Sequence, residues 1–323
     1  MTPPGRHPAT VEPPRVLSLG DIRVSRFRPE RDSFRDLTKL LNAAYTSLAD
    51  AGLNYVAATQ DVAVTAKRVE AASACWVAHA GEKLAGTICY YNGTRAEAAP
   101  EWYAREEVGY FAQFAVDPAL QGCGIGALLM NVAEERALAD GNLEFACDTA
   151  APARRLVRFY HRRGFRVVGR HQWAHARYES VVLSKRLGIT IRSATQADYP
   201  AIVAISDTTP WEKGDFLMHM LSRRAVDVAC EGERIAGFNA WNRELFSKPM
   251  IWLIAVQPHE RGKGIGSLLF SKAERDCSGS RLYASTNRSN VGMQRFYERR
   301  GYRACGELDL DPGDPEMFYC IDL

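Results

Sequence analysis

The hydrophobic pattern of the chain describes the same succession of elements twice. In the first pass, short apolar strands alternate with helices whose apolar residues recur every three or four positions, so that they share one face. The pattern predicts, in order, strand 22–27, helices 32–48 and 61–71, strands 75–80 and 84–91 joined by a turn at 81–83, strand 108–116, a helix from 125, strand 143–147, helix 152–163, and strands 165–170 and 176–184.

From Gly188 the succession restarts. The second pass predicts strand 189–193, helices 196–207 and 211–222, strands 226–230 and 235–241 joined by a turn at 231–233, strand 250–256, a helix from 265, strand 281–284, helix 289–300, and strands 302–310 and 316–321. Gly262 follows Gly122 by 140 residues and Tyr297 follows Tyr160 by 137, which indicates an internal duplication. We therefore expect an N-terminal domain at 21–187 and a C-terminal domain at 188–323.

Residues 1–20 contain five prolines and few residues that could pack, so we expect a flexible arm there. A tail that binds a partner is the alternative. The length of 323 residues and a hydrophobic content of 46% allow each half its own core. The net charge of +3, from 41 basic and 38 acidic residues, argues against a nucleic-acid-binding protein.

The eight cysteines are scattered, without a Cys-x-x-Cys pair or histidines at zinc-ligand spacing. They predict reduced, mostly buried thiols and no metal site. No stretch reaches the roughly 20 apolar residues that span a membrane, and the chain does not begin with a signal-peptide core. These features favour a cytoplasmic protein that binds neither membranes nor nucleic acid.

Two glycine-rich turns, each between an apolar strand and an amphipathic helix, carry the first chemical signal. They consist of Gln121, Gly122, Cys123, Gly124, Ile125 and Gly126, and of Arg261, Gly262, Lys263, Gly264, Ile265 and Gly266. Glycine lets backbone N–H groups approach a ligand, and a helix that starts there adds its positive dipole end, so a phosphate is the expected guest. The glycine spacing fits neither the dinucleotide fingerprint nor the nucleotide-triphosphate loop.

Both halves resemble the GNAT superfamily of acyl-CoA-dependent acyltransferases, whose loop reads Arg/Gln-x-x-Gly-x-Gly/Ala. The resemblance implies an α+β protein of two tandem GNAT folds, each a mixed, mostly antiparallel sheet flanked by helices. It also implies that the loop amides bind the pyrophosphate of acetyl-CoA. The preceding strand ends would bind its pantetheine arm, through Phe114, Ala115 and Val116 in one half and Ile254, Ala255 and Val256 in the other.

Tyr160 and Tyr297 lie near the ends of the predicted fourth helix of each half, shortly before Gly164 and Gly301. From the pattern alone, both tyrosines form the apolar edge of a helix and both glycines are helix caps. In the family, a tyrosine at this position often protonates the departing thiolate. Catalytic and structural roles both remain open for these two residues.

The two halves differ in the residue that could act as a base. Asp148 lies twelve residues before Tyr160, where some members of the family carry a carboxylate, and the matching residue before Tyr297 is Ser285. Asp148 could instead cap the following helix. Asn290 matches a family asparagine that contacts CoA, although it could simply belong to the first turn of its helix; the first half has Ala153 there.

Taken together, the sequence predicts an acetyl-CoA-dependent N-acetyltransferase that acts on the primary amine of a small molecule, by direct transfer in a ternary complex. Acetylation of a protein or peptide N-terminus and a non-catalytic CoA-binding scaffold are the alternatives. One half or both could be active, and the sequence does not indicate the oligomeric state. The residues expected near the acceptor are Tyr45, Asn54, Tyr55, Gln60 and Trp102 in the first half, and Trp211, Glu212 and Asp215 in the second.

Overall fold

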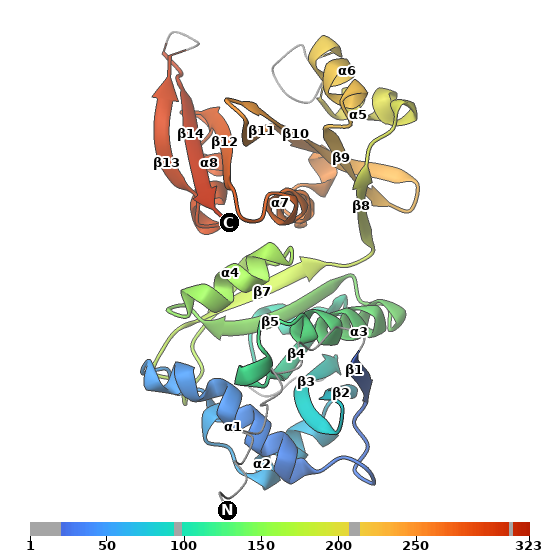
Figure 1. Ribbon diagram of the computed structural model, residues 1–323, viewed down its shortest axis with the longest axis vertical. Coiled ribbons are helices and arrows are strands. Elements are labelled where there is room, and N and C mark those ends of the chain that lie inside the picture. The colour runs from blue at the N-terminus through green and yellow to red at the C-terminus, as the bar shows by residue number, and fades with distance from the viewer. Residues whose placement is uncertain (1–20, 94–98, 207–213, 310–312) are drawn as a thin grey trace, which may run out of the picture.

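The computed structural model describes residues 21–93, 99–206, 214–309 and 313–323. The arm expected at 1–20 lies outside the described residues, as do Trp211 and Glu212. Two seven-stranded sheets, each with helices on its faces, account for most of the rest (Figure 1).

The first sheet has the strand order β1-β2-β3-β4-β5-β7-β6. Its only parallel pair is β4 with β5; the other neighbours are antiparallel. Its elements are β1 (Ile22–Arg26), α1 (Phe34–Asp50), η2 (Val56–Ala58), α2 (Val62–Glu70), β2 (Ala74–Ala80), β3 (Lys83–Asn92), η3 (Glu101–Ala104), β4 (Val108–Val116), η4 (Pro118–Leu120), α3 (Ile125–Ala139), β5 (Glu144–Ala150), α4 (Arg154–Arg162), β6 (Arg166–His171) and β7 (Ser180–Arg186).

The second sheet has the equivalent strand order, β8-β9-β10-β11-β12-β14-β13, again with one parallel pair, β11 with β12. Its elements are β8 (Ile189–Ser193), η5 (Gln196–Asp198), α5 (Tyr199–Ser206), α6 (Gly214–Ser222), β9 (Val226–Glu231), β10 (Arg234–Leu245), β11 (Lys248–Val256), η6 (Pro258–Glu260), α7 (Ile265–Asp276), β12 (Arg281–Asn287), α8 (Val291–Arg299), β13 (Arg303–Leu308) and β14 (Glu316–Asp322). The predicted fold class, two mixed and mostly antiparallel sheets flanked by helices, is confirmed.

Four strand predictions were wrong at one end by three residues or more; β10 continues to Leu245 rather than 241 and β12 continues to Asn287 rather than 284. β5 continues to Ala150, because β7 pairs with it along its whole length, from Glu144 opposite Arg186 to Ala150 opposite Ser180. β7 itself begins at Ser180 rather than at 176. The residues before it are held out of the sheet, since the Asn54 side chain accepts a hydrogen bond from the Arg177 N–H at 2.8 Å and donates one to the His175 carbonyl.

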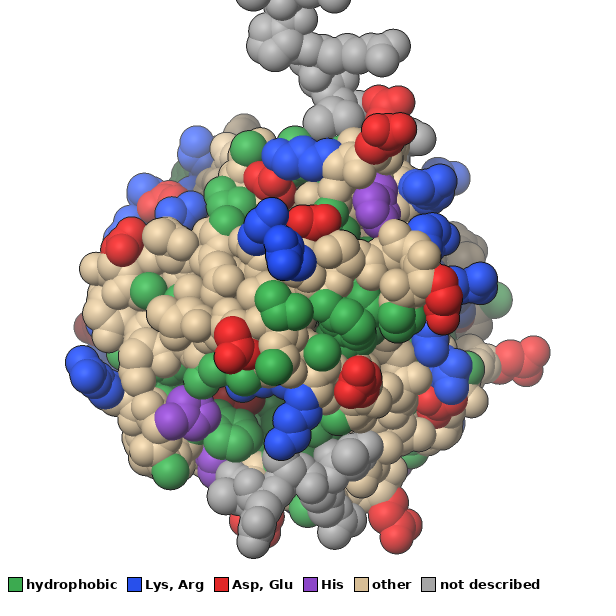
Figure 2. All heavy atoms as spheres, turned by 90° about the horizontal axis from the view of Figure 1, so that it is seen from below, with side chains coloured by type: hydrophobic (Ala, Val, Ile, Leu, Met, Phe, Trp, Pro, Cys, Tyr) green, Lys and Arg blue, Asp and Glu red, His purple; other side chains and the backbone are tan. Residues whose placement is uncertain are grey.

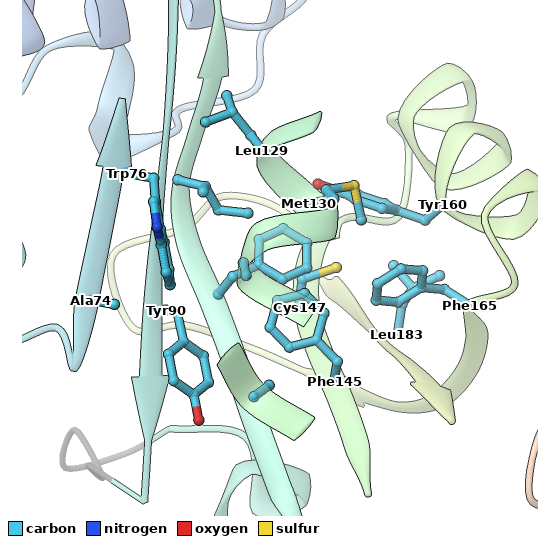
Figure 3. Close-up of a cluster of buried hydrophobic side chains, with 14 of the residues drawn as sticks. Ala74, Trp76, Tyr90, Leu129, Met130, Phe145, Cys147, Tyr160, Phe165 and Leu183 are labelled. Atoms are coloured by element: carbon cyan, nitrogen blue, oxygen red, sulfur yellow. The ribbon is translucent and has the colours of Figure 1, made fainter. Parts of the chain in front are cut away.

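The largest core of the first half lies between the sheet and helices α3 and α4. Its buried side chains include Leu129, Phe145, Tyr160 and Phe165 (Figure 3). A smaller cluster with Leu37 and the neighbouring apolar residues of α1 covers the other face. The glycine loop and the split between β4 and β5 are therefore held between two packed layers.

The two halves meet where α4 of the first packs against α7 of the second (Figure 1), and Arg166 of β6 contacts the loop before α7. The Ser271 hydroxyl of α7 donates to the His161 carbonyl at 2.8 Å, and Leu268 packs on Gly164 so closely that a Cβ there would lie 2.5 Å from its Cδ2. Only Leu187 and Gly188 separate β7 from β8. The helix that follows the second glycine loop is thus part of the contact between halves.

The surface and the thiols agree with the composition. On the face shown in Figure 2, basic and acidic side chains are interspersed around an apolar patch. All eight cysteines are free thiols and only Cys123 and Cys305 are exposed, which confirms the reduced and mostly buried state that the sequence predicts. None of the helices in the described ranges combines the length and apolar character needed to cross a membrane.

Candidate functional site

Each half has its candidate site where the one parallel pair of strands separates. β4 and β5 pair only from Val108 opposite Glu144 to Tyr110 opposite Ala146, although both strands run on beyond this point. β11 and β12 pair at just two positions, Met250 with Tyr283 and Ile251 with Ala284. Past the split, the backbone N–H and C=O groups that would otherwise form hydrogen bonds between the two strands need a side chain, a water or a ligand as a hydrogen-bond partner.

A distortion in β4 accompanies the split in the first half. Gln113 has a φ of 51°, and the register of β4 against β3 shifts between Thr87 and Cys89. The buried Gln113 side chain accepts a hydrogen bond from the Gln60 amide at 2.8 Å. Gln60, expected from the sequence near the acceptor, is itself buried and supports this distorted strand instead.

The first glycine loop presents backbone N–H groups without an acceptor. Gly122 and Gly124 have φ values of 85° and 83°, in the left-handed region that favours glycine. Gly124 is the N-cap of α3, and no side chain caps this helix. Among the described residues, none of the backbone N–H groups from Gly122 to Gly126 donates a hydrogen bond. These donors and the positive end of the α3 dipole suit a phosphate group.

The second loop has the same geometry with more charge around it. Gly262 and Gly264 have φ values of 78° and 92°, and Gly264 caps α7 without help from a side chain. The Arg261 Nε donates to the Val256 carbonyl at 3.1 Å, as the Gln121 amide does to Val116 at 3.3 Å in the first loop. In both loops, therefore, the first side chain donates a hydrogen bond to the carbonyl of the last residue of the preceding strand.

One residue of the first half reaches onto the second loop. The Arg166 Nε donates to the Gly262 carbonyl at 3.1 Å, and its guanidinium pairs with Glu144 at 2.8 and 3.0 Å. A Cβ at Gly264 would lie 2.8 Å from Arg166 Nη1, so a side chain at this position would require the Arg166 guanidinium to move. Consistently, Gly264 is buried, whereas Gly124 in the first loop is half-buried.

Asp148 lies on β5 just past the split and is half-buried. One carboxylate oxygen accepts a hydrogen bond from the Tyr103 hydroxyl at 3.1 Å, and the other accepts one from Trp173 Nε1 at 2.8 Å. The N-cap of α4 is Ala153, so Asp148 does not cap the helix. Within the described ranges, Asp148 forms no salt bridge. Its negative charge is held by neutral donors.

Tyr45 and Tyr55 bridge the separated strands. The Tyr45 hydroxyl donates to the Phe114 carbonyl of β4 at 3.1 Å. The Tyr55 hydroxyl accepts from the Ala150 N–H of β5 at 2.8 Å and lies 2.8 Å from the Thr149 hydroxyl. Burial raises the pKa of both tyrosines, and the charge of Asp148 raises it further. Both hydroxyls therefore stay protonated at neutral pH.

The two predicted catalytic tyrosines are buried in the cores of their halves. Tyr160 is 4% exposed and lies among the side chains shown in Figure 3. Burial raises its pKa well above the ordinary value, with further contributions from Cys147 and from Asp148. Tyr297 is 2% exposed, and its hydroxyl donates to the Ser285 carbonyl at 2.8 Å. Gly164 and Gly301, with φ values of 91° and 89°, follow α4 and α8 as helix caps.

The second half lacks a carboxylate at the position of Asp148. Ser285 is half-buried there, and its carbonyl is engaged by Tyr297. Asn290 is the N-cap of α8, and its side-chain oxygen accepts from the Met293 N–H at 3.1 Å. That bond leaves the two amide hydrogens of Asn290 to donate elsewhere. Asp215, an expected acceptor contact, is exposed in the first turn of α6.

Sequence reasoning placed Tyr45, Tyr55 and Asp148 near one site, and the structure brings these three together. It missed Tyr103, Trp173 and Tyr178. Tyr103 and Trp173 hold the carboxylate, and the Tyr178 ring lies 5.1 Å from that of Tyr55. The prediction of a strand from 176 hid Tyr178, and aromatic side chains in a loop were the one available signal. Asn54 pins this loop and Trp102 stacks with Arg105, so neither belongs to the cluster around Asp148.

Comparison with known proteins covers most of the chain. The model of the acetyltransferase (GNAT) family matches residues 35–165 and again 190–302. No curated protein matches the chain at a significant level. Among solved structures, a GNAT-family acetyltransferase from Bacillus cereus is 26% identical, with a TM-score of 0.38, and the match covers 42% of this chain and 96% of that one.

Two further solved structures give matches of similar extent. An acetyltransferase from Streptococcus agalactiae is 19% identical, with a TM-score of 0.40, over 52% of this chain and 99% of its own. Naa50 from Arabidopsis thaliana, in complex with the bisubstrate analogue CoA-Ac-MVNAL, is 13% identical, with a TM-score of 0.38, over 42% and 100% of the two chains.

Proposed function

The chain belongs to the acetyltransferase (GNAT) family, and on this premise we propose that it transfers an acetyl group from acetyl-CoA to the primary amine of a small molecule. The transfer is direct, within a ternary complex. The observation that carries this proposal is Asp148, a carboxylate without a cationic partner among the described residues, beside the split between β4 and β5.

The free loop amides suit the pyrophosphate of acetyl-CoA, and the unpaired strand ends suit its pantetheine arm. The loop and strand residues are Gln121 to Gly126 and Phe114 to Val116 in the first half, and Arg261 to Gly266 and Ile254 to Val256 in the second, with Asn290 as a further candidate contact. In the second loop the Arg261 and Lys263 N–H groups already donate to the Pro258 and Glu260 carbonyls. The Phe114 carbonyl already accepts from Tyr45, but it has a second lone pair for the arm. When bound, acetyl-CoA supplies the acetyl group as a thioester.

In the transfer, the amine nitrogen forms a bond to the acetyl carbon as the carbon–sulfur bond breaks. An alkyl amine has a pKa of roughly 10 and arrives protonated, so Asp148, or a water bonded to it, accepts its proton. Tyr160 remains protonated because burial raises its pKa; its hydroxyl donates a proton to the leaving thiolate and receives the second proton that the acetylated nitrogen releases. Placing both substrates side by side supplies much of the acceleration.

We assign the transfer to the first half. Asp148 has no counterpart in the second half, where Ser285 stands at the equivalent position. Tyr297, the counterpart of Tyr160, already donates a hydrogen bond from its hydroxyl to the Ser285 carbonyl, so this hydroxyl is engaged within the fold. The second half binds acetyl-CoA or supports the first half without carrying out the transfer.

Calorimetric titration of the full chain with acetyl-CoA tests the first step and counts the sites. Acetylation of a panel of amines should then be followed by mass spectrometry, because a thiol reagent would react with Cys123, which is exposed in the first loop. Asp148→Asn should lower kcat/KM about 100-fold. Ser285→Ala, the matching change in the second half, should leave it unchanged.

Three results would each overturn a part of the proposal. A protein that binds no acetyl-CoA would not be an acetyltransferase of this kind. Binding without acetylation of any amine would favour a non-catalytic scaffold. Acetylation of peptide N-termini but not of small amines would favour the peptide alternative.

A further inference from the structure

Aromatic side chains from separate segments gather around the Asp148 carboxylate. We call this group the aromatic enclosure; it consists of Tyr45 from α1, Tyr55 before η2, Tyr103 from η3, and Trp173 and Tyr178 between β6 and β7. Asp148 is part of a β-strand and cannot move far. A side chain or ligand that meets this carboxylate therefore also meets the enclosure.

The members contact one another in a chain of short distances. The ring centroids of Tyr45 and Tyr55 are 5.2 Å apart, and those of Tyr55 and Tyr178 are 5.1 Å apart. On the other side, Tyr103 and Trp173 donate their polar hydrogens to the two carboxylate oxygens. Asn54 fixes the loop that carries Trp173 and Tyr178, since it bonds both His175 and Arg177. The enclosure is thus held by bonds at both of its ends.

The enclosure carries one negative charge and, among the described residues, no bonded cation. Asp148 accepts only from a phenol and an indole. Burial raises the pKa of Tyr178, and Tyr55 and then Asp148 raise it further. A positive group is therefore the favourable counterpart for this site, and aromatic faces add their own attraction to a cation.

These observations indicate which chemical groups on an acceptor the enclosure would favour. An ammonium gains from Asp148 and from the rings around it, and an apolar or aromatic body gains from the ring faces. A carboxylate on the acceptor would face the Asp148 carboxylate, whose printed partners are a phenol and an indole, and this is unfavourable at close range.

We propose that the enclosure selects alkylamines and arylalkylamines that carry no acidic group, and discriminates against the corresponding amino acids. This inference rests on the proposed function, because the enclosure lies beside the split strands where transfer would occur. The proton of the bound ammonium passes to Asp148, and the neutral amine then forms the bond to the acetyl carbon.

The second half offers a comparison within the same chain. Its equivalent of Asp148 is Ser285, a neutral residue, and its equivalent of Thr149 is Thr286. The two halves therefore differ at the charged position and have the same residue at the next one. An amine that enters the second half meets no carboxylate at this position. Selectivity for cationic acceptors therefore belongs to the first half.

Paired substrates give the direct test. Phenethylamine and phenylalanine differ by one carboxylate, as do tyramine and tyrosine. With saturating acetyl-CoA, kcat/KM should be at least about 10-fold higher for the amine of each pair, the scale expected for a like charge placed close to Asp148. Equal values, or higher values for the amino acids, would overturn the inference while leaving the acetyltransferase proposal intact.

Variants of the full-length protein show whether the enclosure is responsible. Asp148→Asn should bring the amine to amino acid ratio of dissociation constants toward one, measured by calorimetry in the presence of CoA. Tyr178→Leu should raise KM for phenethylamine several-fold with little change in kcat, whereas Tyr178→Phe, which keeps the ring, should resemble the wild type. A ratio that Asp148→Asn does not alter would contradict the role of the carboxylate.

The two proposals fail in different ways. If amines bind more tightly than amino acids and depend on Tyr178, but none is acetylated, recognition stands and the proposed reaction falls. If both classes are acetylated at the same rate, the reaction stands and the selectivity falls. The affinity of each variant for acetyl-CoA shows whether its fold is intact.

Discussion

Asp148 and Ser285 occupy matching positions on β5 and β12, and on this difference we base the proposal that only the first half carries out the transfer. In the first half, a phenol and an indole stabilise an anion next to split strands. In the second half, a tyrosine bonds the backbone of the same position instead. We therefore propose that Tyr160 and Tyr297, which occupy equivalent positions, have different roles, and conservative substitutions can separate these roles.

Replacing each tyrosine by phenylalanine should have opposite effects. Tyr160→Phe should lower kcat about 100-fold, because it removes the proton donor for the thiolate, and should leave the melting temperature almost unchanged. Tyr297→Phe should leave kcat near the wild-type value and cost about 1 kcal/mol of stability, because the carbonyl of the half-buried Ser285 loses the tyrosine donor. Steady-state kinetics and thermal unfolding of both variants check this, and equal kcat values for the two would remove the distinction.

At the scale of elements, the parts of the site that are local in sequence could be predicted and the parts that depend on distant contacts could not. The glycine loops follow from a strand, a turn and a helix within about a dozen residues, so the pattern of Gly122 and Gly124 was enough to place a turn between β4 and α3. The partners of Asp148 lie 45 and 25 residues away along the chain, in η3 and in the loop before β7. No periodicity links them, and only the fold brings them together.

Backbone conformation at the loop can be tested with a matched pair of glycines. Gly124 and Gly52 have the same φ of 83°, but Gly52 follows α1, far from either loop in sequence, and a Cβ there would meet nothing within 4 Å. Each change to alanine should cost about 1 kcal/mol of stability, since both force a side chain into the left-handed region. Gly124→Ala alone should also weaken acetyl-CoA binding, by about 10-fold, because the loop amides shift.

Calorimetry and thermal unfolding of the two variants give the answer. If both variants lose a similar amount of stability but only Gly124→Ala binds acetyl-CoA more weakly, the backbone conformation of the loop is required for binding. Unchanged binding in Gly124→Ala would show that the first loop does not hold acetyl-CoA.

At the scale of the whole molecule, the junction between halves is built around buried polar groups. Arg300 and Glu274 form an ion pair at 2.6 Å with both side chains 2% exposed, and Arg300 also reaches the His161 carbonyl at 3.4 Å. His161 is 4% exposed, and its Nδ1 lies 3.0 Å from the Phe165 carbonyl. Burial lowers the pKa of His161 to about 4, and the charges of Arg300 and Arg299 act in the same direction.

This histidine should make stability depend on pH in a defined window. Below the ordinary pKa of 6.5 the unfolded chain takes up a proton that the folded protein refuses until about pH 4, so stability falls as the pH falls between these values. The loss at pH 4 should be about 3 kcal/mol relative to pH 7. Above pH 6.5 the contribution of His161 is complete and constant.

Urea unfolding at several pH values measures this effect. His161→Asn keeps a donor for the Phe165 carbonyl and does not titrate, so its stability should change less between pH 6.5 and 4 than that of the wild type. Identical slopes for the two proteins would exclude His161 as the cause.

The contact between Arg166 and the second glycine loop has a consequence for how such a chain can evolve. Arg166 and Glu144 belong to the first half, whereas Gly262 and Gly264 belong to the second, and the Arg166 side chain fills the space that a Cβ at Gly264 would need. The copies are joined by only two residues, Leu187 and Gly188. The two halves are therefore not interchangeable modules, because a second half moved into another protein would lose the Arg166 guanidinium that contacts its glycine loop. Among related chains, substitutions at Arg166 and Gly264 should therefore occur together.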